Sequence, residues 1–191
     1  HYLQYDEVNL TDETYDNHSE LILLPSLDEE VDWYDVRGLH DTGLIESLGK
    51  TFSIHSLILE DVVHTFQRPK YEEYDNGNFL LFRALSFDPN AVEVKTEQVA
   101  AFYRKGLVLS FQENEADLFE HVRKRIRLGK GKVRGRGADY LTYALIDSVA
   151  DNYFSVLDQI GECIEDIENQ ILINPDKDIL EKICLIWTQV D

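Results

Sequence analysis

The residues best suited to chemistry are carboxylates concentrated between Ala138 and Ile173. Asp and Glu recur throughout this stretch, which contains no Lys or Arg. Where two acids stand four residues apart, as Asp147 and Asp151 do, a helix places them one turn apart, and they repel each other by about 0.2–0.5 kcal/mol. The stretch therefore needs a counter-charge, which can come from basic side chains of another segment, from a neighbouring subunit or from a hard cation.

Two pairs of acids are candidates for holding such a cation. Asp147 and Asp151 share one face of the long predicted helix, and Glu60 and Asp61 adjoin near the end of a short one. Mg²⁺ keeps several of its waters and is held by one or two carboxylates, so these pairs suit a weak, water-mediated Mg²⁺ site. On composition alone, an acidic, solvated helix face is the favoured interpretation.

Other motifs favour no catalytic chemistry. The basic run is compatible with phosphate binding, but it lacks a P-loop order and stacking aromatics, which favours a solvated helix end and linker that offsets nearby acids or faces an anionic membrane surface. Its members are Arg123, Lys124, Arg125, Arg127, Lys130, Lys132, Arg134 and Arg136. His40, His55, His64 and His121 show no paired-ligand spacing, and capping or core roles are expected for them. We therefore expect a protein that is not an enzyme, with a metal-dependent hydrolase the least favoured class.

The composition and net charge of the chain limit the classes of partner further. There are 37 acidic and 18 basic residues, a formal charge of −19, which argues against nucleic acid and favours cations. The two cysteines are far apart and indicate a reducing compartment. No apolar run reaches the ~18–20 residues of a membrane span, and the first residues given do not show a signal-peptide pattern. Because the chain has no Met and stops inside a helical pattern, we expect a fragment whose missing part lies at least on its C-terminal side.

The elements that must position the acids alternate between strands and helices. The patterns predict strands at 21–24, 31–37, 70–74, 79–87, 96–104 and 107–112, and helices at 42–48, 53–64, 115–128, 138–173 and 177–191. This order predicts an α/β fold, namely an α/β/α sandwich with a central mixed sheet, followed by a long antiparallel helical hairpin. The expected domains are an α/β/α domain at 1–128, a Gly/basic linker at 129–137, and the long acidic helix with the start of the second hairpin helix at 138–191.

Local signals set the expected boundaries. Residues 1–20 are predicted to form a strand-like edge or a mobile arm, and Trp33 is expected on the buried side of its strand. Asp41 or Thr42 should cap the helix that Gly49 ends, and His55 is a candidate cap for the next helix. Residues 75–78, Asp-Asn-Gly-Asn, predict a hairpin turn.

The segment from Ile54 to Phe82, IHSLILEDVVHTFQRPKYEEYDNGNFLLF, resembles the cytoplasmic domain of the CorA family of Mg²⁺ transporters. Its Leu-Glu-Asp and Gln-Arg-Pro-Lys elements carry the similarity, with Ser56 where the family usually has Pro. Further matches are 38–41 (GLHD), 97–99 (EQV), 111–113 (FQE), 123–126 (RKRI), 138–141 (ADYL), 145–147 (LID) and 151–154 (DNYF). The resemblance covers roughly Asp32 to Asp191.

The resemblance implies a cytoplasmic domain of a homopentameric Mg²⁺ or Co²⁺ channel of the inner membrane. In that family, Mg²⁺ bound between neighbouring cytoplasmic domains holds the channel closed. The family's acids map onto Glu60, Asp61, Asp147 and Asp151, with Mg²⁺ as the bound ion and Co²⁺ or Ni²⁺ as substitutes. The stalk, the membrane helices and a Gly-Met-Asn pore motif are expected outside this chain, together with the adjacent subunit's acid that completes the site.

Two alternatives remain open from the sequence. One is the cytoplasmic domain of a related zinc transporter, for which the chain shows no His/Cys cluster. The other is a soluble acidic protein-interaction module whose helical hairpin docks on a partner helix. The leading expectation stays a regulatory, Mg²⁺-sensing domain on the cytoplasmic side of a membrane channel.

Overall fold

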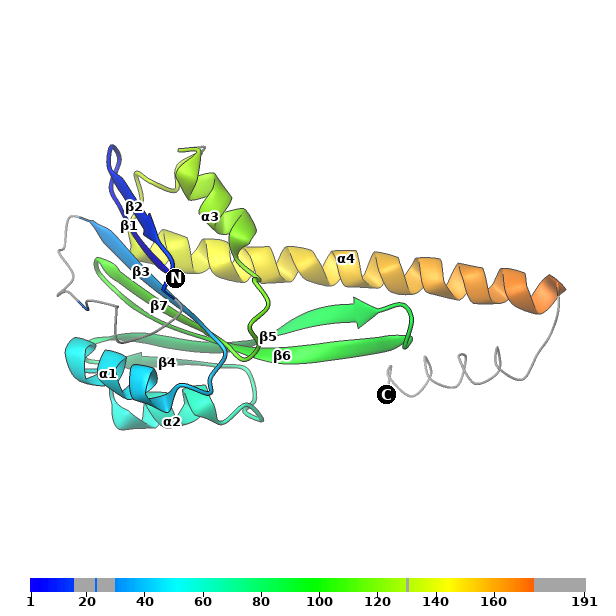
Figure 1. The fold of residues 1–191 in the computed structure, drawn as a ribbon, viewed down its shortest axis with the longest axis horizontal. Helices are drawn as coiled ribbons and strands as arrows, with labels where there is room; N and C mark the ends of the chain where they lie inside the picture. The colour runs from blue at the N-terminus through cyan, green and yellow to red at the C-terminus, as the bar shows by residue number, and fades with distance from the viewer. Residues whose placement is uncertain (16–22, 24–29, 130, 174–191) are drawn as a thin grey trace. The chain divides into compact units, whose positions relative to one another are not determined.

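A computed structural model describes residues 1–15, 23, 30–129 and 131–173 of the chain. These residues form seven strands and four helices: β1 (Tyr2–Tyr5), β2 (Leu10–Glu13), β3 (Val31–Arg37), α1 (Thr42–Phe52), α2 (Ser56–Val63), β4 (Lys70–Tyr74), β5 (Gly77–Asp88), β6 (Glu93–Arg104), β7 (Leu107–Gln112), α3 (Glu120–Arg127) and α4 (Ala138–Ile173). The strands make one sheet in the order β2-β1-β3-β7-β6-β5-β4 (Figure 1). Because β3 and β7 are parallel whereas β6 and β7 are antiparallel, the sheet is mixed, as predicted.

Contacts divide the chain into two units. The first holds His1–Arg83 and Glu97–Ser148, and the second holds Ala84–Thr96 and Val149–Asp191. Most of the sheet and its helical layers belong to the first unit. In the second, the Asn152 side-chain amide donates a hydrogen bond of 2.6 Å to the Leu85 carbonyl, which ties α4 to the end of β5.

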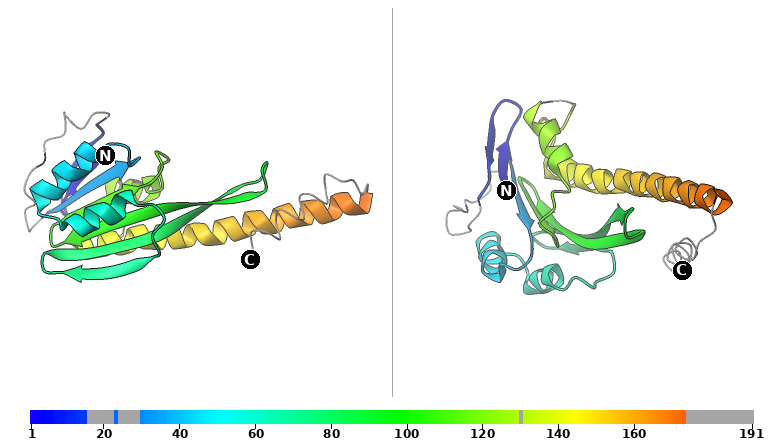
Figure 2. Two further views of the ribbon diagram at one scale, coloured as in Figure 1. Left: turned by 90° about the horizontal axis from the view of Figure 1, so that it is seen from below. Right: turned by 45° about the vertical axis from the view of Figure 1, so that its right-hand side comes forward.

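In the first unit the sheet is covered on both faces. Helices α1 and α2 lie against one face, and α3 with the first turns of α4 lies against the other (Figures 1 and 2). Successive strand residues point to opposite faces, so Tyr34 of β3 packs against Phe52 of α1 whereas Trp33 packs against Phe119 beside α3. The predicted α/β/α sandwich is confirmed, and Trp33 is completely buried, as expected.

The central pair of strands explains why both layers are needed. Every residue of β7, and every residue of β3 except Arg37, is buried. Parallel pairs of this kind occur where helices cover both faces of a sheet. The N-terminal strands β1 and β2 extend the same sheet beyond β3, so the strand-like edge predicted for residues 1–20 is confirmed for Tyr2–Glu13.

Side-chain caps fix the ends of the two short helices. Asp41 accepts a hydrogen bond of 2.9 Å from the Leu44 amide at the start of α1. His55 does the same for α2 through its Nδ1 atom, at 3.2 Å from the Leu57 amide. Both caps were predicted, and each satisfies a backbone donor that a helix start leaves unpaired.

Three helices differ from the prediction at one end, and the first of these differences is that α2 starts at Ser56 rather than at residue 53. Helix α1 does not end at Gly49 but continues to Phe52, and Ser53 closes it in a left-handed conformation. A Cβ atom at Gly49 would lie 2.3 Å from the Leu59 side chain, so glycine serves close packing of α1 on α2 rather than termination. Helix α3 begins at Glu120 instead of residue 115, because the preceding loop is held by the Gln112 and Asp117 side chains, which accept from backbone amides.

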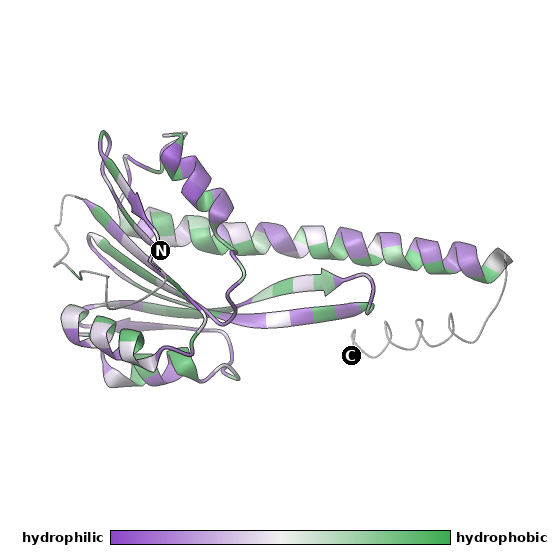
Figure 3. Ribbon diagram, in the orientation of Figure 1, coloured by the Kyte–Doolittle hydropathy of each residue, from purple (hydrophilic) through white to green (hydrophobic). Residues whose placement is uncertain are grey.

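Helix α4 spans the predicted range, with hydrophobic and hydrophilic bands alternating along it (Figure 3). Its buried apolar residues include Leu141, Leu145, Val149, Val156 and Ile167, whereas Tyr153 and Ile164 of the predicted stripe are exposed. The predicted helix 177–191 lies outside the described residues, as does the predicted strand 21–24 except for residue 23.

Candidate metal centre

The first acidic pair lies at the C-terminal end of α2. Ile58 and Val62 are buried in the core and fix the orientation of the helix, which leaves Glu60 exposed and Asp61 half-buried. Gln98 of β6 donates hydrogen bonds to the carbonyls of Asp61 (3.0 Å) and Val62 (3.3 Å) and anchors this end. Carboxylates near a helix C-terminus oppose the helix dipole, so they require a counter-charge.

Lys70 supplies that counter-charge for Asp61. Its Nζ atom lies 2.7 Å from Asp61 Oδ2 and 3.1 Å from Glu72 Oε1. Burial disfavours the charged lysine, but the hydrogen bonds to Asp61 and Glu72 outweigh burial and raise the pKa of Lys70. A hydrogen bond from Tyr74, followed by the one from Lys70, lowers the pKa of Glu72. The three charged side chains form one small network.

The second acidic pair lies on α4. Asp147 is half-buried and accepts a hydrogen bond of 3.3 Å from the Tyr143 hydroxyl, and Asp151 is exposed one turn further along. Helix α2, which carries Asp61, and the first turns of α4, which carry Asp147, cover opposite faces of the sheet (Figure 1). Among the residues that the structure describes, no three His, Cys, Asp or Glu side chains gather in a way that could hold a metal ion.

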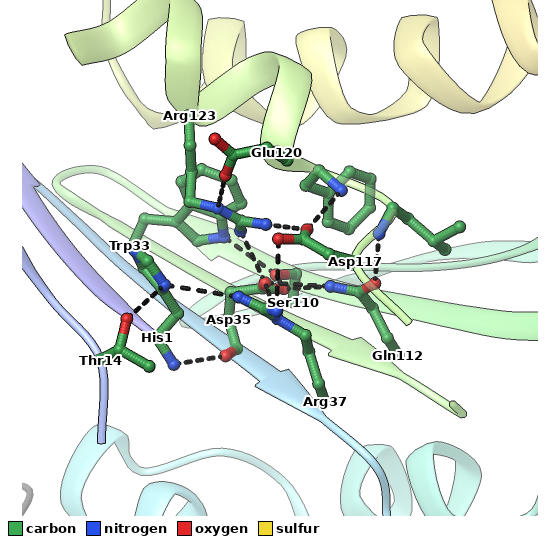
Figure 4. A network of polar contacts seen from close by, with 12 residues as sticks. His1, Thr14, Trp33, Asp35, Arg37, Ser110, Gln112, Asp117, Glu120 and Arg123 are labelled. Carbon is green, nitrogen blue, oxygen red and sulfur yellow. Dashed lines mark hydrogen bonds and ion pairs between the residues drawn. The ribbon is translucent and has the colours of Figure 1, made fainter. Parts of the chain in front are cut away.

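A buried polar network lies on the face of the sheet that α3 covers, and it was not predicted from the sequence (Figure 4). Asp35 of β3 accepts hydrogen bonds from Ser110 (2.6 Å) and Gln112 (2.8 Å) of β7. Arg123 of α3 reaches the same carboxylate at 2.8 Å and also pairs with Asp117. Burial lowers the pKa of Arg123, and Asp35 opposes that effect. The arrangement fastens α3 to the two central strands.

Arg123 therefore corrects the interpretation of the basic run. It was predicted in a solvated helix end, yet its side chain is 0% exposed. The other members agree better with the prediction: Arg127 pairs with Asp12 and Glu120, and Arg134 donates to the Ile126 and Arg127 carbonyls. The signal in the sequence was Asp35 itself, because a carboxylate in a fully buried strand needs a charged or hydrogen-bonding partner.

Comparison with known proteins identifies the family. The model of the CorA-like Mg²⁺ transporter protein family matches residues 28–190, and the chain belongs to this family. Cobalt/magnesium transport protein CorA of Thermotoga maritima is 39% identical over 150 residues, which cover 78% of this chain and 43% of that protein. The chain thus spans less than half the length of this relative. Membership of a transporter family confirms the prediction that the chain is not an enzyme.

Solved structures agree on the fold. The soluble domain of CorA from Methanocaldococcus jannaschii matches with a TM-score of 0.72 at 18% identity, over 96% of this chain and 69% of that one. The ZntB cytoplasmic domain from Vibrio parahaemolyticus matches with a TM-score of 0.60 at 15% identity, over 96% of this chain and 72% of that one. Within the described ranges, no helix combines the length and apolar character that crossing a bilayer requires.

Proposed function

We propose that this chain is the cytoplasmic, Mg²⁺-sensing domain of a CorA-type magnesium and cobalt channel. Family membership and the 39% identity to a cobalt/magnesium transport protein support the transport role. The fold shared with a CorA soluble domain supports a position at the cytoplasmic face of the inner membrane, with the membrane-spanning part outside the described residues. In this proposal the chain regulates the channel and does not itself conduct ions.

The sensing step rests on the acidic pairs. Helix α2, which carries Glu60 and Asp61, covers one face of the sheet, and the first turns of α4, which carry Asp147, cover the other, so a site that combines the pairs is most simply formed between copies of the chain. Mg²⁺ prefers such oxygen ligands and can reach them through its waters. In a homopentamer, cations between acidic faces offset the repulsion between them and hold the pore closed. Loss of the cations lets the subunits separate, which opens it.

A Mg²⁺ titration tests the sensor. The melting temperature is followed with MgCl₂ and with NaCl at matched ionic strength, because a ligand of the folded state raises stability beyond a general salt effect. We expect a larger rise with Mg²⁺, and a smaller one in Asp61→Asn and Asp147→Asn. Asp158→Asn, the same change on an exposed carboxylate two turns beyond Asp151, is the control. Equal shifts in all variants would remove Asp61 and Asp147 from the site.

The same thermal titration, carried out with other divalent cations, distinguishes a Mg²⁺ sensor from a domain of a zinc transporter. Co²⁺ and Ni²⁺ should replace Mg²⁺ at the carboxylates, since both accept oxygen ligands. A zinc transporter is the second candidate, favoured by the ZntB match but at a lower TM-score than the CorA match. Stabilisation by micromolar Zn²⁺ that Asp61→Asn leaves unchanged would favour it over the Mg²⁺ sensor.

A further inference from the structure

Lys70 forms an ion pair with Asp61, the carboxylate at which Mg²⁺ is proposed to bind. The ammonium lies 2.7 Å from Asp61 Oδ2, and the two side chains are only 28% and 15% exposed. The partners come from different elements, since Asp61 belongs to α2 and Lys70 is the first residue of β4. Strand β4 is an edge strand of the sheet. The ion pair therefore joins the proposed metal ligand to the sheet edge.

A second acceptor holds the same ammonium. Glu72 lies two residues along β4, on the same face of the strand, and its Oε1 atom is 3.1 Å from Lys70 Nζ. The Tyr74 hydroxyl donates to the other Glu72 oxygen at 2.8 Å and keeps that carboxylate in place. The ammonium also lies 5.7 Å from the centre of the Phe79 ring, close enough for a favourable cation–π interaction. Lys70 thus keeps good partners even when Asp61 is withdrawn.

We propose that Lys70 is a built-in competitor of the divalent cation at Asp61, an inference that rests on the proposed function. Without Mg²⁺, the ammonium neutralises Asp61. When Mg²⁺ binds, the ammonium turns to Glu72 and the Asp61 oxygen becomes available to the cation or its waters. Because Mg²⁺ must break the Lys70–Asp61 contact, the free energy of that contact weakens the affinity of the site for Mg²⁺. Lys70 therefore raises the Mg²⁺ concentration at which the site fills.

The type of side chain suits this role. A lysine is a compact charge on a flexible stem, so its ammonium, which lies over the Phe79 ring, can move between two carboxylates. An arginine has a planar guanidinium that grips a carboxylate with two donors. Lys70→Arg should therefore compete with Mg²⁺ at least as strongly as the native lysine.

Removal of the charge tests the competition. In Lys70→Met, the concentration of MgCl₂ that gives half of the maximal thermal stabilisation should fall about fivefold, the upper range expected for a partly exposed ion pair. Lys70→Arg should keep or raise the native value. Lys50→Met is the matched control, since Lys50 is 80% exposed on α1 and its nearest acid is Glu46 at 3.7 Å. The control should change the value by less than about twofold, because exposed charges are screened.

A spectroscopic readout keeps the test independent of stability. The side-chain NMR signals of Lys70 should shift as MgCl₂ is added to the native chain, and should not shift in Asp61→Asn. If Asp61→Asn retains the full Mg²⁺ response, the proposed function fails. If Asp61→Asn loses the response, but Lys70→Met binds Mg²⁺ no more tightly than Lys50→Met and the Lys70 signals stay fixed, the competition is overturned and the sensor stands.

Discussion

Asp35 and Arg123 form an ion pair in which neither side chain reaches solvent. The Arg123 Nη1 atom lies 2.8 Å from Asp35 Oδ2, and both side chains are 0% exposed. Arg123 also lies over the Trp33 ring, 5.4 Å from its centre. When charges are removed from water in this way, the fold is stable only if each has its partner, because an unpaired buried charge leaves the cost of its desolvation uncompensated.

Removal of one partner should therefore strongly destabilise the folded protein. We expect Arg123→Met to lower the free energy of unfolding by about 3–5 kcal/mol, since Asp35 would remain buried with only the longer contact to Arg37, at 3.4 Å, as its counter-charge. Urea denaturation at pH 7 measures the loss. Lys124→Met, at the exposed neighbouring position, should change stability by less than about 0.5 kcal/mol. A similar loss in both variants would contradict the importance of the buried pair.

Glu97 provides a pH-dependent prediction. Burial raises the pKa of Glu97, against hydrogen bonds from Asn114, and the nearby Glu113 adds to the rise. Its folded pKa is then above its unfolded value, so its stabilising contribution is present below the unfolded pKa and is lost as pH rises through the folded pKa. Glu97→Gln should therefore be more stable than the native chain at pH 7.

The advantage of Glu97→Gln should disappear below about pH 4, where the native glutamate is protonated in both states. Thermal melts between pH 3.5 and 7.5 measure the difference. Glu93→Gln, on the exposed part of the same strand, serves as the matched control for the loss of one carboxylate. A constant difference between Glu97→Gln and the native chain would rule out the proposed ionisation effect.

Charge reversal on α4 should stabilise the helix. Glu162 stands four residues from both Asp158 and Asp166, all three exposed, so Glu162→Lys turns two repulsive pairs into two attractive ones. We expect a gain of about 1 kcal/mol in low salt, and Glu162→Gln should give about half of it. In 1 M NaCl the gain should largely vanish. A gain that persists in high salt would show that charge is not its cause.

Two glycines should respond oppositely to alanine. At Gly77, in the β4–β5 hairpin, a Cβ atom would lie 2.5 Å from the Phe102 ring and 2.8 Å from the Tyr103 carbonyl oxygen. Gly77→Ala should therefore cost about 1–3 kcal/mol. At Gly161, within α4, the added carbon would point into open space, and Gly161→Ala should gain about 1 kcal/mol from helix propensity. Chemical denaturation of both variants checks the two signs.

Most of the fold could be predicted because its signals are local. The strand at Val31–Arg37, the Asp41 and His55 caps and the hairpin turn before Gly77 are indicated by neighbouring residues alone. The errors came from tertiary contacts. Gly49 looks like a helix end in the sequence, but its role is to admit the Leu59 side chain. Only the three-dimensional packing of α1 on α2 distinguishes these two uses of glycine.

The candidate site could be predicted less completely. Composition and spacing identified Asp61 and Asp147 as acids that need a counter-charge. They did not identify Lys70 as the partner of Asp61, because nine residues and a change from helix to strand separate the two. Nor did they reveal that Arg123 is buried, since its sequence neighbours Lys124 and Arg125 suggest a solvated surface. Partners that meet through the fold leave no periodic pattern in the sequence.

The parallel pairing of β3 with β7 also has a consequence for synthesis on the ribosome. Strand β3 emerges early, but its neighbour β7 is the last strand of the sheet to be made. Until residue 112 has left the exit tunnel, β1–β3 cannot pair with the rest of the sheet, and the edge of β3 that later pairs with β7 stays exposed. Pairings between distant segments are slow to form and prone to aggregation while they wait. The nascent chain is therefore most vulnerable before β7 appears, and a chaperone that shields the edge of β3 would help it most at that stage.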